Sequence, residues 1–370
     1  MIRLILTGFA VTVLFSSCKN TRLGEASEIK KIKPVVVTEP VPYDTDDPAI
    51  WINAAHPEQS LVVGTDKDEN GGLYVFDLQG KILKDKTVTG IRRPNNVDIS
   101  YGLLLGDSAV DIAVVTERLT HKLRIFSLPD LKPVDNNGIE VFEGEQQPGF
   151  RDLMGIALYK NPNTKKTYAM VGRKTGPTQG GYIWQYLLED NGHAQVKATL
   201  IRKFGSYSGK KEIESIAVDN ELGYVYYSDE GVGVRKYYAD PEKGNEELAL
   251  FAITNFAQDH EGISIYKIND GTGYILVSDQ QANQFHIFTR EGSQGNPHNH
   301  QLVKTIDVST LESDGSEVTS VALNKEFSSG LFVAMSADKT FQFYRWQDIA
   351  GSTLKIAPDG IPASSTSVNK

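Results

Sequence analysis

The chain has 370 residues, of which 40% are hydrophobic and 23% are charged, and its formal net charge at pH 7 is −9. An acidic protein of this size is a poor candidate for general nucleic-acid binding, because the phosphate backbone repels it, but it suits the binding of cations. We therefore expect no nucleic-acid partner. The length allows one large domain or two small ones, and we expect a monomer.

The N-terminus has the pattern of an export signal. Arg3 precedes an apolar run that is too short to span a membrane and ends in two serines. Cys18 follows directly, which resembles a bacterial lipobox, where the thiol is acylated and becomes the new N-terminus. The alternative is a plain signal peptide with an incidental cysteine. We predict a lipoprotein signal peptide over 1–17, lipidation of Cys18 and a tether over 18–31. The protein is then exported and lipid-anchored to the outer membrane, on its periplasmic or surface side.

Short β-rich runs separated by Gly, Asn, Asp and Pro follow, with little helical periodicity. Three strand types recur in a fixed order, roughly every 50 residues. The first type is centred near Ile50, Val97, Ile156, Ile216, Ile263 and Val321. The second type occupies 61–67, 111–118, 168–174, 225–231, 274–280 and 331–338. The third type, rich in aromatics, occupies 73–78, 123–128, 182–188, 234–239, 285–290 and 341–346. A fourth strand is visible over 81–88, 196–204 and 302–308.

A repeat of this kind is the signature of a β-propeller, and six units predict six blades over residues 32–350. Two packed β-sandwiches are the competing architecture, but the repeat does not break in the middle. The last unit lacks a fourth strand, whereas an apolar run over 34–38 is left over. We predict that this run closes the ring by filling the outer position of the last blade, which removes an open sheet edge. The fold class is thus an all-β, six-bladed propeller closed by an N-terminal strand, followed by a C-terminal tail over 351–370.

Equivalent positions of a propeller repeat lie on the same face of the ring, and here they carry charge. The second strands end in Lys67, Arg118, Lys174, Glu230, Gln280 and Asp338. The segments leading into the first strands carry Asp46, Asp47, Asn95, Asn96, Asp98, Asp152, Glu214, Asp259, Glu261, Asp314 and Glu317. Each polar residue alone is ordinary turn chemistry, but the joint pattern favours one functional mouth, at a rim that the sequence leaves open. Oxygen ligands without cysteine or clustered histidine favour a hard cation such as Ca²⁺, and lysine and arginine favour phosphate.

Four segments resemble the β-propeller phytases. They are 44–51 (Asp-Thr-Asp-Asp-Pro-Ala-Ile-Trp), 95–99 (Asn-Asn-Val-Asp-Ile), 168–174 (Tyr-Ala-Met-Val-Gly-Arg-Lys) and 259–262 (Asp-His-Glu-Gly). The resemblance covers about residues 32–350, with all six repeats in order. It implies a calcium-dependent, 3-phytase-like phosphoric monoester hydrolase that acts on phytate, which is inositol hexakisphosphate.

The resemblance also implies roles for individual residues. The phosphate-binding cations correspond to Lys67, Arg118 and Lys174. The acids and the amide around the catalytic calcium cluster correspond to Asp46, Asp47, Glu214, Glu230, Asp259, Glu261 and Gln280. A further calcium- and loop-ordering segment corresponds to Asn95, Asn96 and Asp98, and Asp314 is a gapped match. The implied catalytic residues are Lys67, Arg118, Glu214 and Glu230.

Two departures from the family pattern affect this site. Met154 stands where members of the family commonly have a tyrosine, which weakens a second phosphate subsite. The acidic loop of the last blade is shortened to 312–317, which affects one calcium position.

The implied mechanism is hydrolysis by metal-activated water. Several Ca²⁺ ions lower the pKa of a shared water and neutralise the phosphate, and calcium phytate is the expected substrate. Lys67 and Arg118 stabilise charge on the transferring phosphoryl group, and Lys174 holds a neighbouring phosphate.

Two other functions stay open at this point. A calcium-dependent lactonase or phosphodiesterase would use the same scaffold without needing three phosphate-binding cations. A non-catalytic surface propeller that binds a protein or a glycan would need the acids only for structural calcium. Either enzyme requires convergence, within metal-bridging distance, of Asp46, Asp47, Glu214, Glu230 and Glu261.

Overall fold

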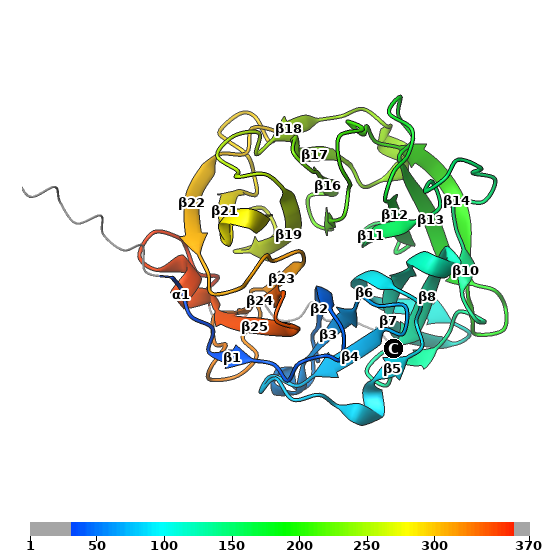
Figure 1. The fold of residues 1–370 in the computed structure, drawn as a ribbon, viewed down its shortest axis with the longest axis horizontal. Coiled ribbons are helices and arrows are strands. Elements are labelled where there is room, and N and C mark those ends of the chain that lie inside the picture. Colours follow the sequence, from blue (N-terminus) through cyan, green and yellow to red (C-terminus); the bar gives the residue numbers. More distant parts are fainter. Residues whose placement is uncertain (1–30, 359–370) are drawn as a thin grey trace, which may run out of the picture. The chain divides into compact units, whose positions relative to one another are not determined.

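The computed structural model describes residues 31–358. The predicted signal peptide, Cys18 and most of the predicted tether lie outside the described residues, as does the far end of the predicted tail. The described residues form six antiparallel sheets around a central axis, five with four strands and one with five (Figure 1). The predicted six-bladed propeller is confirmed.

Each blade follows the predicted strand order from the axis outward. The innermost strands are β2 (Thr45–Trp51), β6 (Pro94–Leu105), β11 (Leu153–Lys160), β15 (Ile216–Asp219), β19 (His260–Lys267) and β23 (Ser316–Thr319). The second strands are β3 (Leu61–Asp66), β7 (Ser108–Glu117), β12 (Thr167–Arg173), β16 (Tyr224–Asp229), β20 (Gly273–Asp279) and β24 (Leu331–Ser336). The third strands are β4 (Gly72–Phe76), β8 (Lys122–Ser127), β13 (Ile183–Asp190), β17 (Gly233–Tyr238), β21 (Gln284–Thr289) and β25 (Thr340–Arg345). The outer strands are β5 (Val88–Thr89), β10 (Ile139–Glu140), β14 (Val196–Phe204), β18 (Ala249–Phe251), β22 (Leu302–Asp307) and β1 (Val36–Val37), and β9 (Lys132–Pro133) also pairs with β8.

Helices are few and short within residues 31–358. The 3₁₀ helices are η1 (Pro57–Gln59), η2 (Lys84–Lys86), η3 (Arg118–Thr120), η4 (Pro241–Lys243) and η5 (Gln280–Ala282), and the α-helix is α1 (Trp346–Ala350). In this described part of the chain, no helix has the length and apolar character needed to cross a bilayer.

The core is divided into six hydrophobic clusters, and each lies between two neighbouring blades. Alternate residues of a strand point to opposite faces of its sheet. Ala49 therefore packs with Val97 of the second blade, whereas Ile50 packs with Phe341 of the sixth. Because both faces of a blade are buried, its strands are continuous apolar runs instead of alternating ones.

The ring is closed as predicted, by a strand from the N-terminal side. In β1, Val36 pairs with Phe343 and Val37 with Gln342 of β25, and the two strands lie side by side in Figure 1. Thr38 extends this pairing, because its N–H donates to Phe341 O at 3.0 Å and its Oγ1 accepts from Phe341 N at 2.9 Å. The sixth blade thus contains β1 from the N-terminal end of the propeller together with β23, β24 and β25 from its C-terminal end.

Replacing Thr38 with proline should weaken this closure. Proline has no N–H, and the substitution also deletes the hydroxyl, so both hydrogen bonds to Phe341 are lost. We expect the free energy of unfolding in a urea titration to fall by about 2 kcal/mol, at about 1 kcal/mol for each bond. Val37→Thr is the control, because Val37 is 50% exposed. Equal stability of the two variants would contradict a closing role for this segment.

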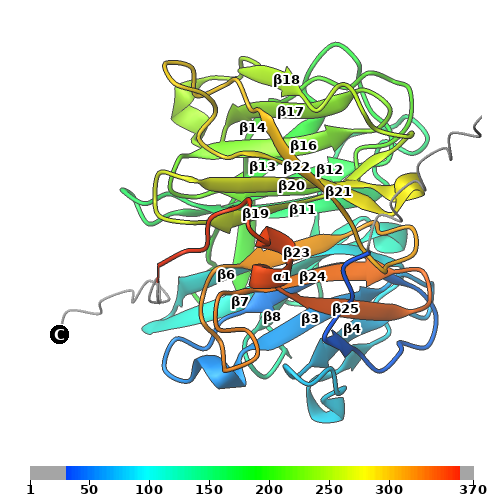
Figure 2. The same cartoon turned by 90° about the vertical axis from the view of Figure 1, so that its left-hand side faces the viewer.

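The chain after β25 also packs on the ring. Trp346, predicted at the end of the last strand, instead begins α1, and its indole stacks on the Tyr266 ring at a centroid distance of 3.6 Å. Leu354 and Ala357 are buried in the same cluster. In the side view, α1 lies over the edge of the fifth and sixth blades (Figure 2).

Candidate active site

One rim of the ring collects the charged residues that the sequence singled out. Because first and second strands are antiparallel, the start of one and the end of the other lie at the same rim. A backbone hydrogen bond repeats there: the residue after each second strand donates to the residue directly before the first strand or, in the fourth and sixth blades, to a residue four or five positions ahead of it. These donor–acceptor pairs are Lys67 to Asp44 (2.6 Å), Arg118 to Arg93 (3.1 Å), Lys174 to Asp152 (2.7 Å), Glu230 to Glu212 (3.2 Å) and Gln280 to Asp259 (3.4 Å). The sixth blade uses Ala337 and Leu311 (2.9 Å), so Ala337, and not Asp338, is the equivalent position.

Three carboxylates meet at this rim. Glu214, Glu230 and Glu261 come from the fourth and fifth blades, and each offers an oxygen atom within 4.8 Å of the others. Burial, followed by repulsion from neighbouring carboxylates, raises the pKa of Glu230 to about 8. Burial and the charges of Glu214 and Glu230 likewise raise the pKa of Glu261. We call these three residues the glutamate cluster.

Lys67 connects the glutamate cluster to the first and last blades. Its Nζ pairs with Asp46 Oδ1, with Asp314 Oδ2 at 3.2 Å and with Glu214 Oε1 at 3.9 Å. Burial opposes the charge on Lys67, but the attraction of these three carboxylates raises its pKa above the usual range. Asn95 supports the same arrangement, because its Nδ2 donates to Asp46 Oδ2 at 3.0 Å and to Glu214 Oε1 at 2.7 Å.

An outer layer of polar residues continues from this centre. Gln280 Nε2 donates to Asp314 Oδ1, and the neighbouring Gln281 donates to Asp259 Oδ2 at 2.8 Å. Lys211 also forms an ion pair with Asp259. Lys211 did not emerge from the sequence, because it lies outside the repeated positions and a lone lysine before Glu212 carries no signal.

The other two predicted cations, Arg118 and Lys174, have different partners from those of Lys67. Arg118 is buried, its Nε donates to Leu153 O at 3.1 Å, and its Nη2 contacts Met154 Sδ. Met154 thus lies directly against the guanidinium, and burial lowers the pKa of Arg118. Lys174 instead pairs with Glu212 Oε1 at 2.7 Å. It lines a separate hollow of about 590 Å³, which also includes Glu230 of the glutamate cluster.

Three predicted ligands do not join the glutamate cluster. Asp47, Asn96 and Asp98 line the central channel, a cavity of about 700 Å³ enclosed by the innermost strands of the blades. Asp47 Oδ2 accepts from Val97 N at 3.0 Å. The expectation that Asp47 converges with Asp46 is therefore wrong. The strand register shifts between Thr45 and Pro48, and although both carboxylates contact the second blade, Asp46 meets Asn95 at the rim and Asp47 meets Val97 N in the channel. Likewise, Asn95 lies at the rim, whereas Asn96 lines the channel.

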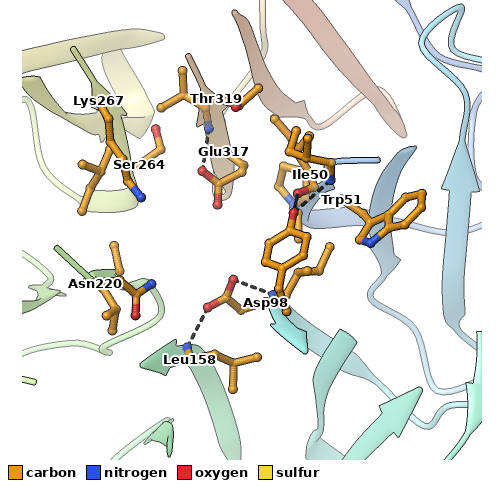
Figure 3. A pocket seen from close by; sticks show the side chains of 18 of the residues that line it. Ile50, Trp51, Asp98, Leu158, Asn220, Ser264, Lys267, Glu317 and Thr319 are labelled. Atoms are coloured by element: carbon orange, nitrogen blue, oxygen red, sulfur yellow. Dashed lines mark hydrogen bonds between the residues drawn. The ribbon is translucent and has the colours of Figure 1, made fainter. Parts of the chain in front are cut away.

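Glu317 completes the polar part of the channel. Figure 3 shows the carboxylates of Asp98 and Glu317 projecting into it from different strands. Asp98 accepts from Ile99 N at 2.6 Å and Leu158 N at 2.7 Å, and burial raises its pKa to about 6. Burial, with repulsion from Asp98, raises the pKa of Glu317 to about 8. The sequence had placed Glu317 only in a loop segment.

The raised pKa of Glu317 predicts a pH-dependent stability. Between the unfolded pKa near 4.5 and the folded pKa of about 8, only the folded state keeps the proton. Glu317 should therefore lower the free energy of unfolding as pH rises from 5 to 8, and its own contribution is at most about 1.4 kcal/mol per pH unit. Glu317→Gln stays neutral and should reduce this slope in urea titrations with a chelator present. The exposed Glu246→Gln is the control, and an unchanged slope in Glu317→Gln would contradict the assignment.

The rim residues fit a bound cation. Three ionised carboxylates cannot share so small a buried space without compensating positive charge. Glu261 Oε2 and Asn95 Oδ1 are buried and have no hydrogen-bond partner among residues 31–358. Carboxylate and amide oxygens are the ligands of hard divalent cations. Of the five acids required to converge, Glu214, Glu230 and Glu261 meet directly, Asp46 joins through Lys67 and Asn95, and Asp47 does not join them. The requirement for all five acids is therefore not met, and the cation site has to be built without Asp47.

Comparison with known proteins identifies the family of this chain. A family model described as Phytase matches residues 3–352. The 3-phytase of Bacillus subtilis (strain 168) is 28% identical over 323 residues, covering 82% of this chain and 80% of that protein. Among solved structures, the Dos1 propeller matches with a TM-score of 0.43 and 12% identity, covering 81% of this chain and 67% of that one. With a family match that spans nearly the whole chain, this protein belongs to the phytase family of phosphoric monoester hydrolases.

Proposed function

We propose that the protein is a calcium-dependent phytase, which hydrolyses phosphate monoesters of inositol hexakisphosphate presented as calcium phytate. The observation that carries the proposal is the glutamate cluster beside Lys67, where a dense set of carboxylates faces a lysine at one rim. The similarity to the 3-phytase of Bacillus subtilis supports the substrate. A lactonase has no need of the lysine and arginine residues at this rim.

The residues that would hold calcium are those of the rim. Oxygen ligands are available from the glutamate cluster and from Asp46, Asp259, Gln280 and Asp314. When bound there, calcium would neutralise phosphate charge and would lower the pKa of water, the nucleophile at neutral pH. The channel residues Asp47, Asn96 and Asp98 take no part in this site.

The chain's own residues then bind and orient the substrate. Lys67 and Arg118 donate hydrogen bonds to oxygens of the phosphate that is cleaved, where charge develops during hydrolysis. Asn95 fixes the orientation of Asp46 and Glu214 through its two hydrogen bonds. Lys174, in the adjoining hollow, binds a neighbouring phosphate of the same inositol ring. The scheme requires no covalent phosphoenzyme.

Phosphate release from calcium phytate, with and without a chelator, tests this function. We expect calcium-dependent release that the chelator abolishes and added calcium restores. Glu230→Gln removes one carboxylate of the glutamate cluster and should shift the calcium dependence to higher concentration, whereas the exposed Glu246→Gln should not. No release at any calcium concentration from the folded protein would overturn the proposal.

We further propose that the protein is an exported lipoprotein held at the outer membrane through acylated Cys18. The support is the sequence of residues 1–18 alone. Mass spectrometry of the mature protein from bacterial cells should show an acylated N-terminal cysteine, and Cys18→Ser should release the protein from the membrane fraction. An unmodified N-terminus upstream of Cys18 would contradict this anchor.

A further inference from the structure

The second blade departs from the others at the repeated rim position. In the first and third blades an aspartate accepts the repeated backbone hydrogen bond: Asp44 accepts from Lys67, and Asp152 accepts from Lys174. In the fourth and fifth blades this residue is also an acid. In the second blade Arg93 accepts this hydrogen bond from Arg118, so two arginines occupy directly paired positions. Like charges at paired positions of a sheet are destabilising unless something compensates them.

The backbone of Arg93 is firmly placed. Its φ is 57°, in the left-handed region that side chains other than glycine rarely adopt. Its N–H donates to Asp68 O at 2.7 Å, directly after Lys67, and its carbonyl accepts from Arg118 N at 3.1 Å. Arg93 is therefore fixed between the segments that carry the two cations assigned to the cleaved phosphate.

Neither guanidinium of this pair has an anionic partner within residues 31–358. Arg118 bonds only to Leu153 O and Met154 Sδ, and the side chain of Arg93 forms no hydrogen bond or ion pair there. Burial is the main reason for the lowered pKa of Arg118; attraction to Glu214 opposes this lowering, and repulsion from Arg93 adds to it. Arg93 is half-buried, whereas Arg118 is buried, so Arg93 lies on the solvent side of the pair.

We infer that Arg93 is a substrate-binding residue, which together with Arg118 binds a phosphate group of the inositol polyphosphate. A phosphate supplies the direct anionic contact that neither guanidinium makes within residues 31–358, and guanidinium groups match its oxygens in bidentate fashion. The inference rests on the proposed function, because it assumes a phosphorylated substrate at this rim. The inference adds Arg93, which lies between the segments of Lys67 and Arg118, to the substrate-binding residues.

Arg93→Asn tests the inference without disturbing the backbone, because asparagine tolerates the left-handed region. We expect the KM for calcium phytate to rise about tenfold or more, as for a lost hydrogen bond to a charged group, with a smaller change in kcat. Arg93→Lys keeps the charge and should recover part of the affinity. The exposed neighbour Arg92→Gln removes the same charge and should leave KM unchanged. A merely structural role would instead lower the melting temperature and leave the lysine variant no better than asparagine.

Calorimetric titration of inositol hexakisphosphate in calcium buffer separates this inference from the proposed function. If the parent protein releases no phosphate, the proposed function fails, and weaker binding by Arg93→Asn than by Arg92→Gln still supports the inference. If the parent is active but Arg93→Asn matches it in KM and in binding affinity, only the inference fails. Equal losses in Arg93→Asn and Arg92→Gln would also overturn it, because they would reflect net charge alone.

Discussion

Replacing Lys67 with methionine should reduce the kcat for phosphate release from calcium phytate on the order of 10²- to 10³-fold. Methionine keeps much of the side-chain volume but removes the ammonium group that would face the phosphoryl oxygens. The same substitution leaves Asp46, Glu214 and Asp314 without their lysine partner, so the site becomes more negative. Calcium affinity should therefore stay the same or increase, while catalysis is lost.

A lower kcat with unchanged or increased calcium affinity distinguishes a catalytic lysine from a lysine that only supports the metal site. Initial rates should be measured over a range of calcium concentrations, with the exposed Lys210→Met as the control. The assignment predicts that activity stays low at saturating calcium and that the calcium concentration at half-maximal rate does not rise. Recovery of full activity by added calcium would contradict it, as would a variant that matches Lys210→Met.

Replacing Arg290 with methionine should give the largest loss of stability. Arg290 and Asp219 are fully buried, and the guanidinium donates two hydrogen bonds of 2.6 Å to the two oxygens of the carboxylate. This pair connects the fourth and fifth blades. Removing one partner leaves Asp219 buried and uncompensated, which costs about 3–5 kcal/mol of unfolding free energy.

Urea unfolding at pH 7 measures this effect, and Arg345→Met provides the comparison. Arg345 pairs with Asp348 at 2.7 Å and with Glu326 at 3.3 Å, but its side chain is 38% exposed. Such a surface pair contributes about 0–1 kcal/mol. If both variants lost the same free energy, burial would not be the reason for the contribution of the Arg290–Asp219 pair.

Much of the fold was predictable because the repeat constrains it. The apolar runs of the strands recur with turn residues between them, and a blade buries both faces against its neighbours, so the number of runs gives the number of blades. The leftover run over 34–38 identified the closing strand, because a ring with an unpaired edge is unfavourable. The boundary at Trp346 was missed, since an aromatic residue fits the end of a strand as well as the start of a short helix.

The sequence by itself determined which residues repeat at strand ends, and therefore that lysine, arginine and carboxylates gather at one level of the ring. Only the tertiary structure decided which of them meet. Asp46 and Asp47 are adjacent in sequence, yet one contacts Lys67 and the other lines the channel, because the strand register shifts at these two residues. Glu214, Glu230 and Glu261 come together because neighbouring blades converge toward the axis, a distance relation that no local pattern contains.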